Sequence, residues 1–178
     1  MEIIPAALDG VKILRPRIFS DLRGSFVKTF HAPTFLAAGL DFTPREEFFS
    51  VSHRNVIRGM HFQLPPHTQA RLVGCLTGKI LDVIVDLRRG SSSTSRVWSH
   101  ELSAVSREML FIPEGFAHGF LALEDNTLVS YVASQPHSPV HDSGIVYNSF
   151  DFNWPVKNPI LSERDKNFCA LAEFPSPF

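Results

Sequence analysis

The sequence predicts a single all-β domain, built as an antiparallel sandwich or barrel. The chain has 178 residues, close to the size of one ordinary domain. Many short apolar segments of strand length follow one another at close spacing, separated by Gly and Pro, and only two short segments have the features of helices. A barrel of this size encloses a cavity for one small ligand, lined by alternate strand residues that point inward.

Composition excludes several other classes of protein. The hydrophobic residues make up 44% and the net charge is −1, whereas a disordered chain has low hydrophobicity and high net charge. The 17 Lys and Arg residues balance 18 Asp and Glu residues, which argues against a nucleic-acid-binding protein. The sequence shows neither a secretory signal nor an apolar run of membrane-spanning length. Because Cys75 and Cys169 are too few for a disulfide framework, we expect a soluble, reduced, cytoplasmic protein without a membrane partner.

The clearest predicted strand is Ile80–Leu87, in which two faces alternate. One face carries Leu81, Val83, Val85 and Leu87, and the other carries Ile80, Asp82, Ile84 and Asp86. The Ser-rich segment 88–95 that follows is expected to be a loop. The other predicted strands, in chain order, are Val11–Leu14, Ser25–Phe30, Phe48–Ser52, Val56–Phe62, Arg71–Leu76, Val97–Leu102, Met109–Ile112, His118–Ala122, Leu128–Ala133 and Gly144–Tyr147.

Two short helices are expected beside these strands. The segment Pro33–Ala38 begins with Pro, which is favoured in the first helical turn, and Gly39 ends it. A second helix is expected after Ser162, because Ser162-x-x-Asp165 has the outline of a capping signal.

Polar residues interrupt the apolar pattern at three places. The first is the predicted strand containing Arg58-Gly-Met-His-Phe-Gln63. Strict alternation places Arg58, Met60 and Phe62 on one face and Gly59, His61 and Gln63 on the other. A buried histidine is ordinarily structural, but the nearby Arg58, Gln63 and Arg71 favour a functional His61.

The second and third interruptions are His118 and Tyr131. Tyr131 lies in the apolar segment LVSYVA, where its phenol either forms a structural hydrogen bond or serves as a proton donor. The string Pro113-x-Gly115-x-x-His118 resembles the second motif of the cupin superfamily, in which this histidine is often a metal ligand. The first cupin motif normally supplies a His-x-His pair, where this chain has His61-Phe-Gln63, and His67 is expected in a loop. Since catalytic metals usually need three protein ligands, we expect no metal.

The remaining chemistry is that of an acid–base site. The sequence has neither a glycine-rich phosphate loop nor a Gly-x-Ser-x-Gly motif. A histidine, a tyrosine and several arginines in a barrel suit the removal of a proton next to a carbonyl group on an anionic substrate. A neutral imidazole, with an ordinary pKa near 6.5, has the right basicity for this step at about pH 7.

Four strings resemble one family. They are Asp21-Leu-Arg-Gly24, Asn55-Val-Ile-Arg-Gly-Met-His-Phe-Gln63, Ile112-Pro-Glu-Gly-Phe-Ala-His-Gly-Phe120 and Leu161-Ser-Glu-Arg-Asp165. In order and spacing they are similar to the dTDP-4-dehydrorhamnose 3,5-epimerase family, enzymes with a cupin jelly-roll fold that act on nucleotide-linked 4-keto-6-deoxy sugars. The resemblance covers roughly residues 13 to 165 and implies a single epimerase domain over residues 1–178.

The resemblance also implies roles for individual residues. His61 matches the catalytic base, Asp165 the carboxylate that orients it, and Tyr131 the phenol that returns a proton from the opposite side. The residues implied to bind substrate are Arg23, Phe26, Lys28, Glu46, Phe48, Arg58, Gln63, Arg71 and His118. The family implies a homodimer that exchanges its N-terminal segment, a nucleotide-diphosphate sugar as substrate, and no cofactor or metal.

Several positions depart from the family pattern. Arg71 stands where the family usually has Lys, Lys28 where Glu is common, and Glu46-Glu-Phe48 where Gln-x-Asn is usual. Because these changes cluster at ligand-contacting positions, the inverted carbon could be C3, C5 or both. A ketoisomerase of the same fold and a non-catalytic nucleotide-sugar-binding module are the alternatives.

Overall fold

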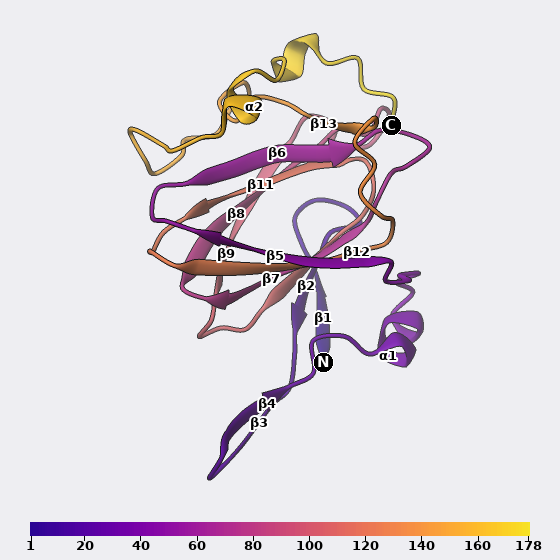
Figure 1. The fold of residues 1–178 in the computed structure, drawn as a ribbon. Helices are drawn as coiled ribbons and strands as arrows, with labels where there is room; N and C mark the ends of the chain where they lie inside the picture. Colours follow the sequence, from indigo (N-terminus) through magenta and orange to yellow (C-terminus); the bar gives the residue numbers. More distant parts are fainter.

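Two antiparallel sheets pack face to face in the computed structural model, which describes residues 1–178 (Figure 1). The six-stranded sheet has the order β1-β2-β10-β7-β12-β5, and the five-stranded sheet has the order β13-β6-β11-β8-β9. This arrangement confirms the predicted all-β fold. The strands of the two sheets are β1 (Glu2–Pro5), β2 (Lys12–Arg15), β5 (Glu46–Ser52), β6 (Ile57–Gln63), β7 (Arg71–Thr77), β8 (Lys79–Asp86), β9 (Val97–Ser103), β10 (Met109–Ile112), β11 (Phe116–Ala122), β12 (Thr127–Ala133) and β13 (Asp142–Gly144).

The two predicted helices are present. Helix α1 (Ala32–Ala37) has Pro33 in its first turn, and Gly39 follows its end with a φ of 72°, which glycine adopts without steric cost. Helix α2 (Glu163–Lys166) is capped by Ser162, whose hydroxyl accepts a hydrogen bond from the Asp165 amide at 3.1 Å. A 3₁₀ turn, η1 (Leu171–Glu173), lies near the C-terminus. None of these helices has the length and apolar character needed to cross a membrane.

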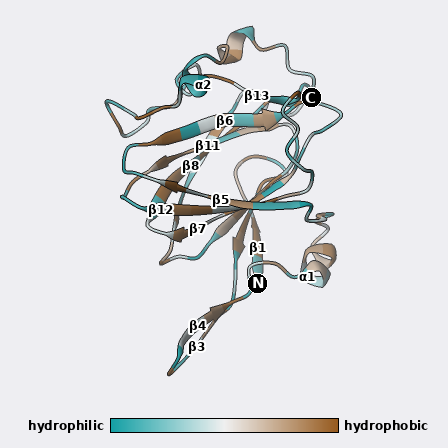
Figure 2. Cartoon of the chain, viewed as in Figure 1, coloured by the Kyte–Doolittle hydropathy of each residue, from teal (hydrophilic) through white to brown (hydrophobic).

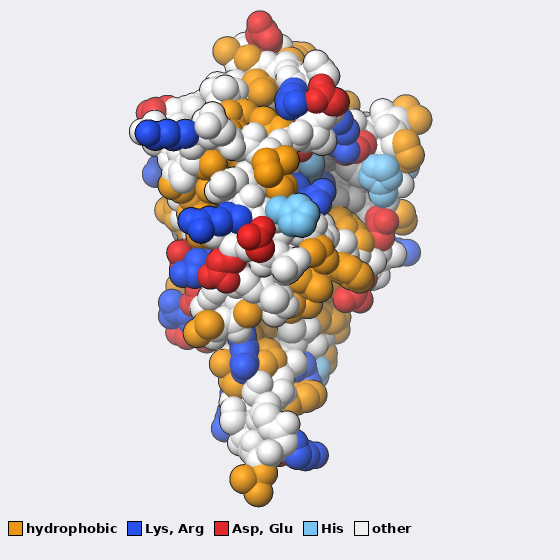
Figure 3. All heavy atoms as spheres, turned by 60° about the vertical axis from the view of Figure 1, so that its left-hand side comes forward, with side chains coloured by type: hydrophobic (Ala, Val, Ile, Leu, Met, Phe, Trp, Pro, Cys, Tyr) orange, Lys and Arg blue, Asp and Glu red, His pale blue; other side chains and the backbone are white.

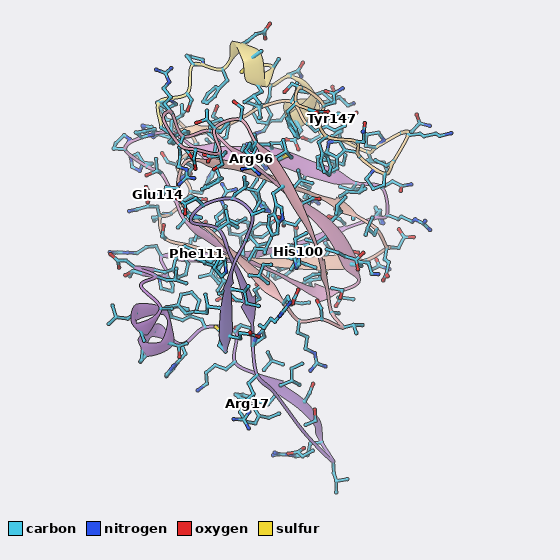
Figure 4. The ribbon with its side chains drawn as sticks, turned by 180° about the vertical axis from the view of Figure 1, so that it is seen from behind. Arg17, Arg96, His100, Phe111, Glu114 and Tyr147 are labelled. Carbon is cyan, nitrogen blue, oxygen red and sulfur yellow. The ribbon has the colours of Figure 1, made fainter.

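A two-stranded hairpin projects from the body of the molecule (Figure 1). It consists of β3 (Ile18–Asp21) and β4 (Gly24–Val27), and Figure 4 shows Arg17 at its root. The prediction of one strand over Ser25–Phe30 was therefore wrong in its extent, and β3 was missed. All four residues of β3 are exposed, so no alternation between buried and exposed positions marks it in the sequence.

Two further predictions need correction at the edges of the sheets. The edge strand β1 was not predicted, and the strand expected at Gly144–Tyr147 instead covers Asp142–Gly144. Both are edge strands of three or four residues, too short for a hydrophobic period to define their bounds.

Strand β8 shows why the sandwich has apolar residues on both faces of one sheet. Ile80 and Ile84 point into the core between the sheets, while Val83 and Val85 point outward into a second core. The C-terminal segment covers that second core with Phe150, Phe152, Trp154, Phe174 and Phe178. Figure 2 accordingly shows mostly apolar strands, interrupted along β6 by hydrophilic positions.

A β-bulge changes the direction of side chains on β6. His61 pairs with His118 and Arg58 pairs with Phe120, so three steps along β6 match two steps along β11. Arg58 therefore lines the same cavity as His61 and Gln63, whereas Met60 and Phe62 lie in the outer core. The prediction that Arg58 shares a face with Met60 and Phe62 was wrong, because strict alternation does not allow for the extra residue.

Candidate active site

A cavity of about 400 Å³ opens between the two sheets. Figure 3 shows a hollow in the upper half of the molecule, bordered by histidine and by Lys or Arg side chains. The predicted site residues that line this cavity are Glu46, Phe48, Arg58, His61, Gln63, Arg71, His118 and Tyr131. They come from strands of both sheets, which places polar chemistry inside the barrel.

His61 is paired with a buried carboxylate. Its Nε2 lies 2.8 Å from Oδ1 of Asp165, whose side chain is 5% exposed, while that of His61 is 25% exposed. The second oxygen, Oδ2, accepts a hydrogen bond from the Gly59 amide at 3.2 Å. With Nε2 protonated and bound to Asp165, Nδ1 of the neutral imidazole is left as the proton acceptor.

The environment keeps Asp165 ionised. Burial alone would raise its pKa, but the hydrogen bond and charge of His61 and the Gly59 amide lower the pKa below its ordinary value. A carboxylate at this position stabilises the imidazolium that forms when His61 takes a proton. The pair therefore has the character of a general base held in one orientation.

Tyr131 lies on the opposite wall, on β12 of the six-stranded sheet. It is 7% exposed, and no hydrogen bond to the protein contributes to the environment of its hydroxyl. Burial and the nearby charge of Asp82 raise the pKa of Tyr131 well above its ordinary value of 10. The phenol therefore remains protonated at neutral pH. Because its hydroxyl has no structural hydrogen bond, the role as a proton donor is the one that stays as a prediction.

His118 is held by a second buried carboxylate. Its Nε2 lies 2.7 Å from Oδ2 of Asp82, and both side chains are almost fully buried. The ring of His118 lies edge-on to Tyr131, with 6.0 Å between ring centroids. Burial raises the pKa of Asp82 despite the opposing effect of His118. The contact with Asp82 therefore holds the imidazole of His118 in place next to the phenol of Tyr131.

Two arginines bring positive charge to the cavity without a carboxylate partner. Arg58 donates from Nε to Ser52 Oγ at 3.0 Å and from Nη2 to the carbonyl of Val51. Arg71 donates from Nε to Gln69 Oε1 at 2.8 Å and from Nη1 to the His61 carbonyl at 3.2 Å, and burial lowers its pKa. Since the other hydrogen-bond donors of these guanidinium groups are free, they suit an anionic ligand.

Gln63 and Glu46 hold the loop above the cavity. The Gln63 amide donates to the carbonyl of Pro136 and accepts from the Ser138 amide, and Glu46 accepts from the amide of His137 at 2.6 Å. The structure therefore uses their polar atoms to position residues 136–138. Their predicted contact with substrate stays a prediction.

The remaining predicted residues lie elsewhere in the chain. Arg23 and Phe26 are on the projecting hairpin, and Lys28 follows it, so none of the three lines the cavity of its own chain. Arg23 is instead paired with Asp21 and is 90% exposed.

Sequence reasoning missed several residues of the site. The cavity is also lined by Ser50, Gln69, His137, Asp142 and Arg164, and Asp82 lies behind it. Asp82 carried a signal as a carboxylate within an apolar strand, Arg164 lies in the string Leu161-Ser-Glu-Arg-Asp165, and His137 lies in a segment that departs from the family pattern, but none of the three was assigned a role. No three His, Cys, Asp or Glu side chains come together in a group that could hold a metal ion.

A barrel that places a His–Asp pair and a buried phenol on opposite walls, beside arginines without carboxylate partners, is the arrangement expected of an epimerase with the cupin fold. Residues 5–173 match the family model described as dTDP-4-dehydrorhamnose 3,5-epimerase. The chain belongs to this family and is an isomerase.

Relatives with curated names agree with this membership. A dTDP-4-dehydrorhamnose 3,5-epimerase of Methanothermobacter thermautotrophicus is 41% identical over 98% of this chain and 96% of its own. A dTDP-4-dehydrorhamnose 3-epimerase of Streptomyces niveus is 35% identical over 97% of this chain and 85% of its own. The crystal structure of a Legionella pneumophila 3,5-epimerase in complex with dTDP-4-keto-L-rhamnose has a TM-score of 0.92 and 32% identity, covering 97% of this chain and 93% of the other.

Proposed function

We propose that this protein inverts both C3 and C5 of a dTDP-linked 4-keto-6-deoxyhexose during deoxysugar biosynthesis. The observation that carries the proposal is the placement of His61 and Tyr131. His61 comes from the five-stranded sheet and Tyr131 from the six-stranded sheet, so the base and the acid lie on opposite walls of one cavity. Inversion at carbon requires a proton to leave one face and another to arrive at the opposite face.

The reaction proceeds through an enolate. Nδ1 of His61 takes the proton from the carbon next to the ketone, and the electron pair of the broken C–H bond moves onto the keto oxygen. Asp165 stabilises the resulting imidazolium, and Arg71 stabilises the enolate oxygen in the buried end of the cavity. Tyr131 then gives its proton to the same carbon from the other face, after which His61 releases its extra proton to solvent and Tyr131 takes a proton from solvent.

Arginine side chains suit the diphosphate of the substrate. Arg58 has no carboxylate partner and borders the cavity beside Ser52. A guanidinium group binds phosphate oxygens through two parallel hydrogen bonds. Arg58 therefore binds the diphosphate group of the substrate. The hairpin of a second subunit contributes Arg23, Phe26 and Lys28 to the same binding site.

The functional form is a homodimer. The hairpin exposes Ile18, Phe19, Leu22 and Phe26, and Figure 3 shows an apolar side chain at its tip. The outer face of the six-stranded sheet exposes Phe49, Val51 and Leu76. Apolar surfaces of this kind are typical of interaction sites, and a partner's hairpin would bring in the predicted substrate-binding residues that the cavity of one chain does not contain.

The reaction takes place in the cytoplasm in this account. Cys75 and Cys169 are both free thiols, as expected for a reducing compartment.

Proton exchange tests the proposed reaction. The protein is incubated in D₂O with dTDP-4-keto-6-deoxyglucose, and NMR follows deuterium at each carbon and the configuration of the product. We expect deuterium at C3 and C5 and the product inverted at both carbons. Inversion at C3 alone would match the Streptomyces niveus relative and contradict the double epimerisation. Binding without exchange at either carbon would support a binding module instead.

A further inference from the structure

Phe48 is the only side chain without a polar atom among those that line the cavity. It lies on β5 directly opposite Tyr131 of β12, and in such a pair the two side chains project from the same face of the sheet. Their rings are stacked, with 4.8 Å between centroids and 10° between planes. Phe48 is 43% exposed, so part of its ring remains open to the cavity.

This stacking places an apolar surface next to the reacting carbon. In the proposed reaction Tyr131 delivers a proton to that carbon, and Phe48 lies one ring spacing from the phenol. In a 4-keto-6-deoxyhexose, C5 carries a methyl group, whereas C3 carries a hydroxyl group. A methyl group against Phe48 is buried favourably, but a hydroxyl group there has no hydrogen-bond partner.

The same strand becomes polar immediately beyond Phe48. Ser50 is the next residue on the inward face, and its hydroxyl oxygen is buried without a partner in the protein. Ser52 follows and accepts a hydrogen bond from Arg58. The wall therefore changes from apolar at Phe48 to hydrogen-bonding at Ser50 and cationic at Arg58, as suits a ligand that carries a methyl group at one end and phosphate oxygens at the other.

We propose that Phe48 is a specificity-determining residue that recognises the C6 methyl group of a 6-deoxy sugar. This inference rests on the proposed function and extends it to the part of the sugar that the protein selects.

The test compares two substrates in three proteins. The substrates are dTDP-4-keto-6-deoxyglucose and the dTDP-linked 4-ketopentose that lacks C6 but is otherwise alike. The proteins are wild type, Phe48→Ser, and Phe48→Leu as the control that keeps an apolar side chain. NMR measures kcat/KM for deuterium uptake at C5. The ratio of the two kcat/KM values within each protein is unaffected by a general loss of activity.

We expect wild type to prefer the hexose by about tenfold or more, the usual effect of one methyl group in an apolar pocket. Phe48→Ser should lose most of this preference, and Phe48→Leu should keep most of it. Equal kcat/KM for both sugars in wild type, or an unchanged preference in Phe48→Ser, would overturn the inference alone. An absence of exchange by wild type with either sugar would instead contradict the proposed function.

Discussion

His61, the proposed base, is held in place by residues that are far from it in the sequence. Asp165, which binds its Nε2, is carried by a four-residue helix near the C-terminus, and Ser162 holds that helix by capping its first turn. Phe168 then packs edge-on against the imidazole, with 5.8 Å between ring centroids. These contacts fix which nitrogen faces the substrate, so the chemistry at one residue depends on the whole C-terminal segment.

The role of Asp165 predicts a specific loss of activity. In Asp165→Asn the amide still occupies the site but no longer stabilises an imidazolium, so kcat for deuterium exchange should fall by about 10²–10⁴-fold. KM should change little, because Asp165 does not line the cavity. Steady-state kinetics by NMR measure both quantities, and a rise in KM with unchanged kcat would show that Asp165 serves binding instead.

Substitution of Tyr131 should slow inversion of the sugar more than removal of the first proton. In Tyr131→Phe the first proton can still leave to His61, but no donor remains on the opposite wall. We expect inversion to slow by about 10²-fold or more and deuterium exchange without inversion to slow less. The measurement is the ratio of deuterated starting sugar to inverted product over time. An equal loss of both rates would argue against Tyr131 as the acid.

At the scale of elements, prediction from sequence succeeded where local rules decide the structure. The alternation of β8 defined both of its faces, because both faces are covered, and Ser162 with Asp165 located α2 through a capping pattern. The same rules failed for the exposed hairpin and for Arg58. A bulge depends on how β6 pairs with β11, and Gly59 and Gly119 allow a close approach there, since a Cβ on Gly59 would lie 2.6 Å from Gly119 Cα.

The loop after β8 is organised around one carboxylate. Asp86 is fully buried and accepts hydrogen bonds from Arg88, Ser91 and Ser93. Burial alone would raise its pKa, but these hydrogen bonds, with that of Arg88 the strongest, lower the pKa to about 2 from 3.8. The Ser-rich segment predicted as a loop is thus an ordered element.

This network predicts an acid-dependent stability. Because the pKa of Asp86 is lower in the folded state, its stabilisation is present above about pH 4 and is lost as the pH falls toward 2. Asp86→Asn should lower the free energy of unfolding by about 2 kcal/mol at pH 6. Urea unfolding at several pH values measures this difference, which should shrink as the pH approaches 2. Equal stabilities of the two proteins at pH 6 would contradict the prediction.

Two parts of the site depend on the tertiary structure of the whole molecule and could not be predicted from local sequence: the Asp142–Arg164 ion pair and the hairpin residues. Asp142 and Arg164 meet at the cavity through an ion pair of 2.8 Å, although they come from an edge strand and from α2. Neither lies in an apolar pattern that it would interrupt, so neither stood out. Arg23 lies in one of the family strings and Phe26 follows it on the hairpin, but neither lines the cavity of its own chain, and only the proposed homodimer would bring them to a site.

Mixing two inactive variants tests that exchange between subunits. Arg23→Ala lacks the hairpin contact, and His61→Ala lacks the base. If each hairpin completes the partner's cavity, a mixed dimer contains one cavity with both residues. After co-refolding of equal amounts of the two variants, half of all dimers are mixed. In each mixed dimer, one of the two cavities is intact. Activity should therefore return to about a quarter of the wild-type value by this counting for a C₂ dimer. No recovery above the sum of the separate variants would contradict the exchanged hairpin, and a monomer by light scattering would contradict the dimer.

The central claim is that His61 removes the substrate proton, and deuterium uptake by His61→Ala tests it most directly. This variant is incubated in D₂O with dTDP-4-keto-6-deoxyglucose beside the wild-type protein, and calorimetry with dTDP confirms that the nucleotide still binds. We expect wild type to exchange protons at C3 and C5, and the variant to exchange them at least about 10²-fold more slowly, as for loss of a general base. Exchange at the wild-type rate by a variant that binds dTDP normally would contradict the account.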